Sequence, residues 1–149
     1  MILFRGLFSF LIVFLFIGIH LPALAQKQNE KDAPFGYSNK GDSIEFVFGQ
    51  QQKIQIGTVV VELEKRLKEI NQVNVAGDFN GWNPGDNKFQ MHRTGNLFIL
   101  LVSKNALGKK EELHQFKFVL NHTWWVEPPI NAINRLKGKD GNTNLTLKY

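Results

Sequence analysis

Residues 115–126 read QFKFVLNHTWWV, which is the pattern of a β-hairpin. The first half alternates large apolar groups with other residues, so one face of an extended strand would be apolar: Phe116, Phe118 and Leu120. Lys117 and Val119 then fall on the opposite face. Asn121-His122 fits a tight two-residue turn between antiparallel strands. The stretch therefore predicts an antiparallel sheet that packs its phenylalanine face on a core.

Two adjacent tryptophans lie on the returning strand of this hairpin, which spans Thr123–Val126. Because neighbouring strand residues point to opposite faces, one of Trp124 and Trp125 should point inward and the other outward. A third indole, Trp82, ends the loop GDFNGW at residues 77–82. Core or rim packing would explain any one of these rings taken alone.

The rest of the chain repeats short β-patterned segments separated by turn residues. The predicted strands are 43–48, 73–76, 88–92, 97–102 and 144–149. The stretch 53–71 mixes a strand pattern at its start with a helical stripe formed by Val60, Leu63, Leu67 and Ile70, and predicts a strand followed by a short helix near 60–70. About seven strands at 8–12-residue spacing are typical of an all-β, immunoglobulin-like β-sandwich.

The first 25 residues have the pattern of a signal peptide. Arg5 precedes an apolar run over 7–19, and Ala23-Leu24-Ala25 matches a signal-peptidase site. The alternative is a retained membrane anchor, but the run is short for the ~20 residues that span a bilayer. We expect a polar, flexible lead-in over 26–41, then one domain over 42–149, secreted or periplasmic and free of the membrane after cleavage. The chain has no cysteine, so this domain must fold without disulfides.

Charge and composition argue against several classes of function. The net charge is +5, and the lysines are scattered without an arginine-rich run, which does not suit a nucleic-acid-binding surface. His92, His114 and His122 show no metal-ligand spacing and lie near no carboxylate or serine motif, so we expect solvated side chains. No catalytic set stands out. We therefore expect no enzyme activity and no cofactor.

The loop that carries Trp82 is built to hold that ring outward. Phe79 can plug the core, Asp78 and Asn80 can bind their own backbone, and the glycines can take positive φ. Together with Lys117 and an outward tryptophan, Trp82 would form an aromatic platform with a hydrogen-bond donor beside it. Such a surface suits a sugar, because pyranose rings offer apolar C–H faces for stacking and hydroxyls for polar groups.

Three motifs in this order resemble a known family: VAGDFNGWN at 75–83, FKFV at 116–119, and Trp124 with Glu127-Pro128. The pattern is similar to the glycogen-binding domain of the AMP-activated protein kinase β subunit, to family 48 carbohydrate-binding modules and to early-set domains beside α-amylase-like barrels. The resemblance covers residue 73 to the end of the chain. It implies non-catalytic binding of an α-1,4-glucan by Trp82, Lys117 and Trp124.

The same resemblance implies that Leu136 and Asn144 complete the carbohydrate site. It also implies an α-glucan polysaccharide as ligand and a separate glucan-active enzyme as a possible partner. Asn121-His122-Thr123 departs from the family's Asp-Gly turn, and the 53–71 stretch has no counterpart in the family. The alternative function is a secreted structural or protein-interaction module that keeps the fold without the sugar site.

Overall fold

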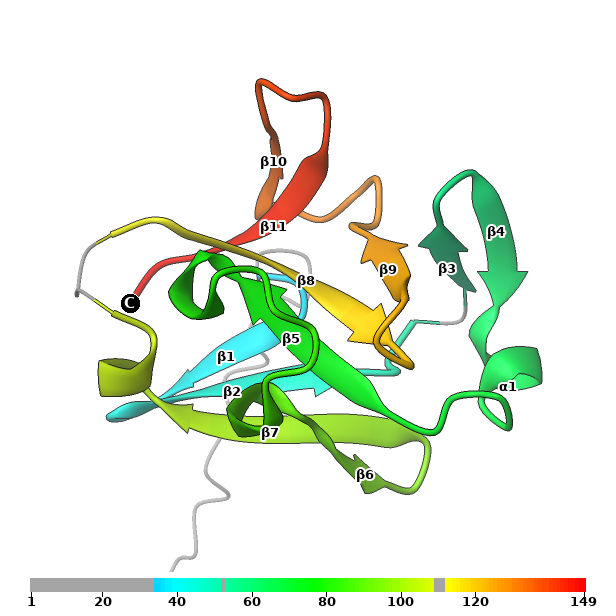
Figure 1. The fold of residues 1–149 in the computed structure, drawn as a ribbon, viewed down its shortest axis with the longest axis horizontal. Coiled ribbons are helices and arrows are strands. Elements are labelled where there is room, and N and C mark those ends of the chain that lie inside the picture. The colour runs from blue at the N-terminus through cyan, green and yellow to red at the C-terminus, as the bar shows by residue number, and fades with distance from the viewer. Residues whose placement is uncertain (1–33, 52, 109–111) are drawn as a thin grey trace, which may run out of the picture.

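The computed structural model of this protein describes residues 34–51, 53–108 and 112–149. The predicted signal peptide and the first part of the predicted lead-in lie outside the described residues. The described chain is a β-sandwich of two antiparallel sheets with little helix (Figure 1), which confirms the all-β prediction. The immunoglobulin-like classification stays a prediction.

The first sheet has four strands in the order β1-β2-β7-β6. Their bounds are Tyr37–Lys40, Ser43–Phe48, Leu97–Ser103 and His92–Thr94 respectively. β2 alternates half-buried and buried residues along its whole length, as expected for a strand with one face on the core. β2 and β7 pair over six residues and form the centre of this sheet.

The second sheet is organised around β8 (His114–Leu120). β5 (Val73–Gly77) pairs with one edge of β8, so β11 and β9 share the opposite edge. The sheet continues from β11 to β10 and from β9 through β3 to β4. These strands span Thr143–Leu147 (β11), Trp124–Glu127 (β9), Arg135–Lys137 (β10), Lys53–Ile56 (β3) and Val59–Glu62 (β4).

The core lies between the two sheets and is rich in phenylalanine. Phe46 of β2 packs edge-on against Phe116 of β8, with 5.2 Å between ring centroids, and Phe48 packs against Phe118 at the same distance. Leu120 is fully buried beside them. The predicted inward face of β8 is therefore confirmed, and the alternate residues of β8 lie on the outer face of the second sheet.

The ambiguous stretch 53–71 begins with a strand and contains a short helix, as predicted, but a second strand occupies 59–62, where the helical stripe was expected to begin. β3 and β4 pair as a hairpin, and α1 (Leu63–Arg66) follows directly. Leu63, Leu67 and Ile70 are buried as the helical stripe predicts. Val60 is the exception, because it belongs to β4 and is exposed. Among the described residues, no helix is both long and apolar enough to cross a membrane.

Two predicted segments have a different structure from the one expected. The predicted strand 88–92 is a 3-10 helix, η2 (Asn87–Phe89), followed by β6, because the Asp86 side chain accepts the Lys88 N–H and caps a turn there. The last part of the expected lead-in forms β1, which pairs with β2. Tyr37 anchors β1 to the core, because its ring packs edge-on against Phe116.

Candidate functional site

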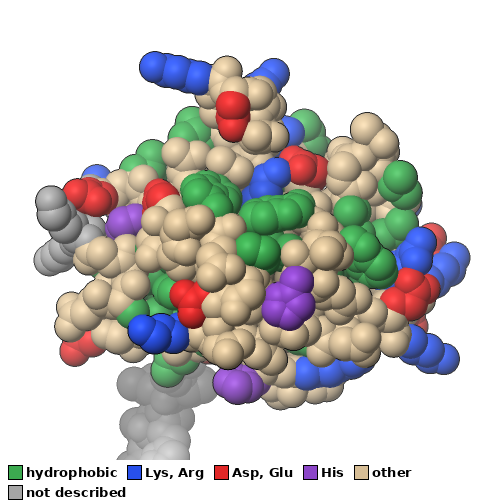
Figure 2. Space-filling view, viewed as in Figure 1, with side chains coloured by type: hydrophobic (Ala, Val, Ile, Leu, Met, Phe, Trp, Pro, Cys, Tyr) green, Lys and Arg blue, Asp and Glu red, His purple; other side chains and the backbone are tan. Residues whose placement is uncertain are grey.

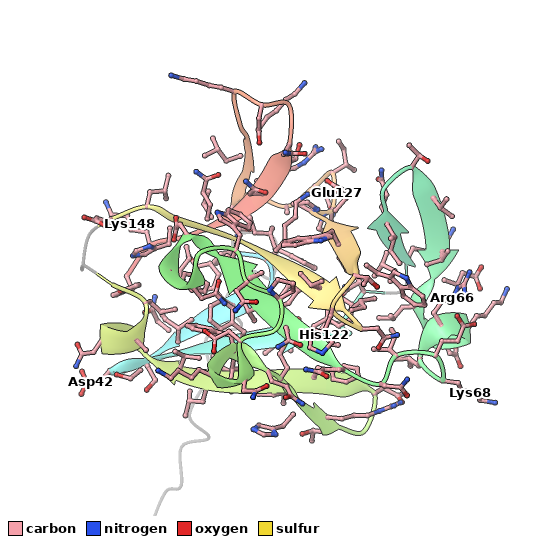
Figure 3. All side chains as sticks on the ribbon, in the orientation of Figure 1. Asp42, Arg66, Lys68, His122, Glu127 and Lys148 are labelled. Carbon is pink, nitrogen blue, oxygen red and sulfur yellow. The ribbon has the colours of Figure 1, made fainter. Side chains whose placement is uncertain are left out.

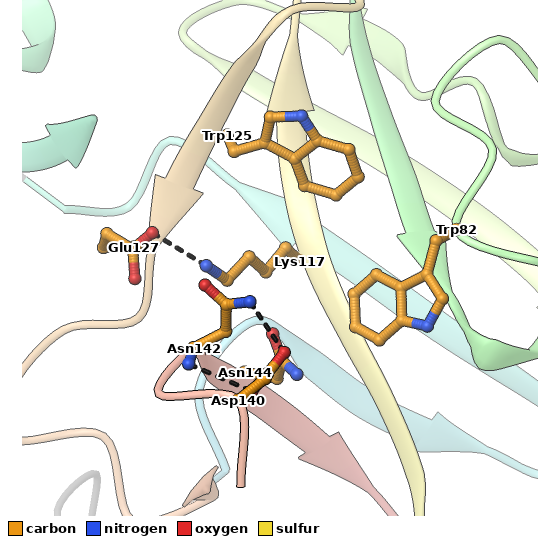
Figure 4. Close-up of a pocket in the computed structure, with 7 residues that line it drawn as sticks. All are labelled: Trp82, Lys117, Trp125, Glu127, Asp140, Asn142 and Asn144. Carbon is orange, nitrogen blue, oxygen red and sulfur yellow. Dashed lines mark hydrogen bonds and ion pairs between the residues drawn. The ribbon is translucent and has the colours of Figure 1, made fainter. Parts of the chain in front are cut away.

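A hollow of about 430 Å³ lies on the outer face of the second sheet (Figure 4). Its lining combines two indoles with charged and amide side chains: Trp82, Lys117, Trp125, Glu127, Asp140, Asn142 and Asn144. In the space-filling view, hydrophobic side chains gather below the β10–β11 hairpin with basic and acidic groups beside them (Figure 2). The hollow is open to solvent.

Trp82 reaches the hollow from the loop that follows β5. The Asn80 side chain holds this loop, because its Oδ1 accepts the Gly77 N–H at 2.9 Å and its Nδ2 donates to the Val75 carbonyl at 3.1 Å. The Trp82 N–H donates to the Gly77 carbonyl at 2.8 Å. Trp82 itself has φ of 59°, a left-handed conformation that is rare for bulky residues. The surrounding hydrogen bonds therefore hold the Trp82 backbone in this left-handed conformation.

Gly77 is required where this loop leaves β5. A Cβ at Gly77 would lie 2.5 Å from the Gln115 carbonyl oxygen and 2.7 Å from the Phe79 ring. Phe79 lies over the end of the core, stacked on Phe89 with 4.9 Å between centroids, in the predicted role of a plug. The close approach of these groups leaves no room for a side chain at position 77.

His114 corrects one of the predictions. It was expected to be solvated and far from any carboxylate, but its side chain is buried, with Nδ1 3.0 Å from Asp78 Oδ1. Asp78 Oδ2 also accepts the Gln115 N–H at 2.8 Å. The partners are 36 residues apart in sequence, so a search for local motifs could not find them. This contact ties the start of the Trp82 loop to β8.

The other two histidines are exposed, as predicted. His92 lies at the start of β6. His122 lies in the turn between β8 and β9, where its Nδ1 is 2.9 Å from the Pro84 carbonyl oxygen (Figure 3). Within the described ranges, no group of three or more histidine, aspartate or glutamate side chains could hold a metal ion.

Lys117 and Glu127 form an ion pair on the floor of the hollow. Lys117 Nζ lies 2.7 Å from Glu127 Oε1 and joins β8 to β9. The lysine side chain is 7% exposed and that of the glutamate 26%. Lys117 thus lies on the outer face as predicted, but it is covered rather than solvated. Such a pair offers a donor and an acceptor in fixed positions close to the indoles.

The two neighbouring tryptophans of β9 separate to opposite faces, as predicted, but Trp125 is the one in the hollow. Its ring centroid lies 6.4 Å from that of Trp82, with 42° between the ring planes. Trp124 packs against the core and lines a different, apolar cavity with Ile56 and Val61. The expected placement of Trp124 beside Trp82 and Lys117 is therefore corrected to Trp125.

The register of the β8–β9 hairpin explains this difference. A two-residue turn at Asn121-His122 would place Trp124 opposite Val119, on the outer face. The connection instead contains three residues, so Leu120 pairs with Trp124 and Val119 with Trp125. A shift of one residue moves every side chain of a strand to the other face.

Contacts with a distant segment hold the three-residue connection. Asn121 Oδ1 accepts the Asn71 N–H at 2.9 Å, and Asn121 Nδ2 donates to the Glu69 carbonyl at 2.8 Å. The Asn121 N–H donates to the Gln72 carbonyl at 2.9 Å. Both Asn121 and His122 have positive φ, which asparagine accepts more readily than most residues. The segment before β5 therefore helps to decide which indole faces the hollow.

The β10–β11 hairpin forms the remaining wall of the hollow. Asn142 donates to Asp140 through both its backbone N–H, at 3.1 Å, and its side chain, at 2.7 Å. These two hydrogen bonds hold the pKa of Asp140 below its usual value. Asn144 Nδ2 donates to Gln115 Oε1 at 3.0 Å, which links the hairpin to β8.

Leu136, the last predicted site residue, does not line the hollow. It lies on β10 directly opposite Asn144 in the strand register, so both side chains point to the same face. Leu136 is 38% exposed. The structure thus brings Trp82, Lys117 and Asn144 together, whereas Leu136 is connected to them only through its strand partner Asn144.

Sequence reasoning missed three polar residues of this site: Glu127, Asp140 and Asn142. Glu127 had a usable signal, because it is two positions from Trp125 and must share its face. Asp140 and Asn142 had none, since both precede the predicted strand 144–149 and no strand pattern covers them.

Comparison with known proteins adds no relative: no protein-family model matches the chain, and no curated protein matches its sequence.

Proposed function

We propose that this protein binds an α-1,4-glucan, such as glycogen, starch or a maltooligosaccharide, without acting on it chemically. The observation that carries the proposal is the pair of half-buried indoles, Trp82 and Trp125, beside the Lys117–Glu127 ion pair. Large aromatic surfaces with a few fixed polar groups are the usual composition of ligand sites.

The geometry of the indoles favours a curved carbohydrate chain. The apolar faces of glucose rings stack on aromatic rings, and successive rings of an α-1,4-linked chain are inclined to each other. The planes of Trp82 and Trp125 are inclined by 42°, so two consecutive glucose units could each stack on one ring. A flat β-linked chain would contact both rings less well.

The polar groups around the indoles suit sugar hydroxyls, which both donate and accept hydrogen bonds. Lys117 is a donor, Glu127 and Asp140 are acceptors, and Asn142 and Asn144 can do either. Most of these side chains are already held by one another, as the short contacts above show. A ligand would therefore immobilise few additional side chains on binding, which lowers the entropic cost of association.

The strained backbone of Trp82 supports a functional role for this ring. A non-glycine residue in the left-handed region costs about 1–3 kcal/mol and persists where its surroundings enforce it. Here Asn80 and Gly77 enforce it through three hydrogen bonds. A ring needed only for packing would not require a strained backbone. Here the strained backbone directs the indole to the rim of the hollow.

Binding of short chains should be weak, with a dissociation constant of about 10⁻³ to 10⁻⁵ M, since one shallow site desolvates little surface. Retention would then come from the many equivalent chains of a polymer, or from a separate glucan-active enzyme that supplies a second site. The proposed setting is secreted or periplasmic, where such polymers and enzymes meet.

Affinity electrophoresis tests the proposal. The residue 26–149 protein should migrate more slowly in native gels that contain glycogen or amylopectin than in gels without polymer. A gel with a soluble β-linked glucan is the control for linkage. Equal mobility in all gels would refute glucan binding and favour the alternative of a protein-interaction module. Equal retardation by both linkages would refute the argument from the inclined rings.

A further inference from the structure

The β4 strand forms an open edge of the second sheet. It pairs with β3 on one side, and the strand order places no other described strand beyond it. Its apolar residues are open to solvent: Val59 is 57% and Val60 61% exposed. Figure 1 shows β3 and β4 at one end of the molecule, away from the β10–β11 hairpin.

Natural edge strands usually carry a charge, a proline or a bulge that prevents pairing with another chain. β4 has none of these in its first three residues, which are all valine, and reaches a charged residue only at Glu62. The hydrogen-bonding groups on its outer side are thus open to a further strand.

We propose that β4 pairs antiparallel with β4 of a second copy of this chain. A two-fold axis perpendicular to the sheet would run beside Val60 and place it opposite the partner's Val60. In this register Val59 lies opposite the partner's Val61, and Thr58, the turn residue just before β4, lies opposite the partner's Glu62. Symmetric dimers need such a self-complementary surface, because the same patch is used twice.

The sequence of β4 fulfils this requirement. Valine meets valine at the three central positions, and β-branched cross-strand pairs stabilise sheets. Glu62 meets a threonine hydroxyl rather than a like charge. A register shifted by one residue is excluded, since residues directly opposite must share a face and the two-fold axis keeps Val60 of both copies on one face.

An apolar cavity of about 210 Å³ beside β4 gives the contact more surface. It is lined by Ile56, Val59, Val61, Arg66 and Trp124. The partner's Val59 would lie opposite Val61 on this same face and extend the apolar lining. The partner's Val59 would thus cover the side of the cavity that is open in the single chain.

The pairing would place two copies of the outer face side by side. Strands β9, β3 and β4 are neighbours, so five strand spacings separate β9 from its counterpart, or about 24 Å. The perpendicular axis keeps both hollows on the same side of one continuous sheet. This consequence rests on the proposed function: if each hollow binds glucan, the dimer would hold one polymer at two points and gain avidity.

Sedimentation equilibrium tests the dimer without any ligand. Pairing over five residues of each copy is small beside the ~1,200–2,000 Å² of stable interfaces, so we expect a dimer only at high concentration, about 10⁻⁴ M. Val60→Lys should abolish it. Leu101→Lys is the matched control, because Leu101 is equally exposed at 61% but lies on β7, a central strand of the other sheet. A monomer at all concentrations up to about 1 mM would overturn the proposal.

Substitutions at Thr58 test the register itself. Thr58→Lys would place a lysine opposite the partner's Glu62 twice in the dimer and should tighten it about two- to thirty-fold. Thr58→Glu would oppose like charges and should weaken the dimer by a similar factor. Equal effects of the two changes, or a Val60→Lys variant that still dimerises like the wild type, would overturn the assigned contact.

A glucan gel separates failure of this proposal from failure of the proposed function. Val60→Lys should bind maltoheptaose in calorimetry as the wild type does, yet be retarded less by amylopectin. If the wild type does not bind maltoheptaose, the glucan site is refuted, but the sedimentation test of the dimer remains valid. If Val60→Lys no longer dimerises but is retarded by amylopectin as strongly as the wild type, the dimer does not contribute avidity.

Discussion

Exchanging Trp125 or Trp124 for alanine should produce opposite effects on binding and stability. Trp124 packs against the core and lines the apolar cavity beside β4. Truncation of a buried tryptophan costs about 3–5 kcal/mol, and for this half-buried ring we expect about 2 kcal/mol. In a domain of this size that lowers Tm by about 8 °C. Glucan binding of the folded Trp124→Ala variant should persist.

Trp125→Ala should do the reverse. The ring lies on the outer face opposite Val119, and loss of one cross-strand pair costs about 0.2–1 kcal/mol. If the indole stacks on the sugar, its loss should cost about 2 kcal/mol of binding free energy, or about 30-fold in affinity. Trp125→Phe keeps an aromatic face and should retain part of the binding.

Thermal unfolding followed by circular dichroism and affinity electrophoresis in amylopectin measure the two effects on the same samples. The reasoning fails if Trp124→Ala loses binding with an unchanged Tm while Trp125→Ala binds normally. That result would mean that the β8–β9 hairpin has the two-residue turn and the opposite register. Loss of stability in both variants without loss of binding would assign both rings to packing.

The remaining predictions concern the loop, the core, salt and pH. Gly77→Ala should destabilise the domain and weaken glucan binding together, because its Cβ would collide with the Gln115 carbonyl oxygen; denaturant unfolding and gel retardation measure both. Phe116→Ala should cost about 3–5 kcal/mol in urea unfolding, and a near-neutral result would contradict the assigned core face. Maltoheptaose affinity should change little between low and moderate salt, since this ligand carries no charge and forms no ion pair with the site; a steep loss in calorimetry would indicate an anionic ligand. Burial raises the pKa of Tyr149, with Glu112 adding to the shift, so the folded state keeps this proton longer than the unfolded chain. Stability should therefore fall above about pH 10, and Tyr149→Phe should remove that part of the loss in thermal melts at alkaline pH.

The inner and outer faces of β8 could be predicted from the sequence because they follow from a local rule. The period of two in a strand assigns alternate residues to opposite faces, so Phe116 and Phe118 are buried in the sandwich while Lys117 lies on the outer face. The Trp82 loop was also predictable, since Asn80 and the glycines beside it act within six residues. The short helix after a strand in 53–71 followed from the same kind of local pattern.

Only the tertiary structure decided which indole joins Trp82. The register of β9 depends on the length of the turn, and Asn121 holds that turn through residues 50 and 52 positions earlier in the chain. The contact of His114 with Asp78 likewise joins residues 36 positions apart, and the polar wall depends on a hairpin in which only the second strand, β11, has a strand pattern in the sequence. Contacts between distant segments leave no periodic trace in the sequence, because each is formed only when the chain has folded.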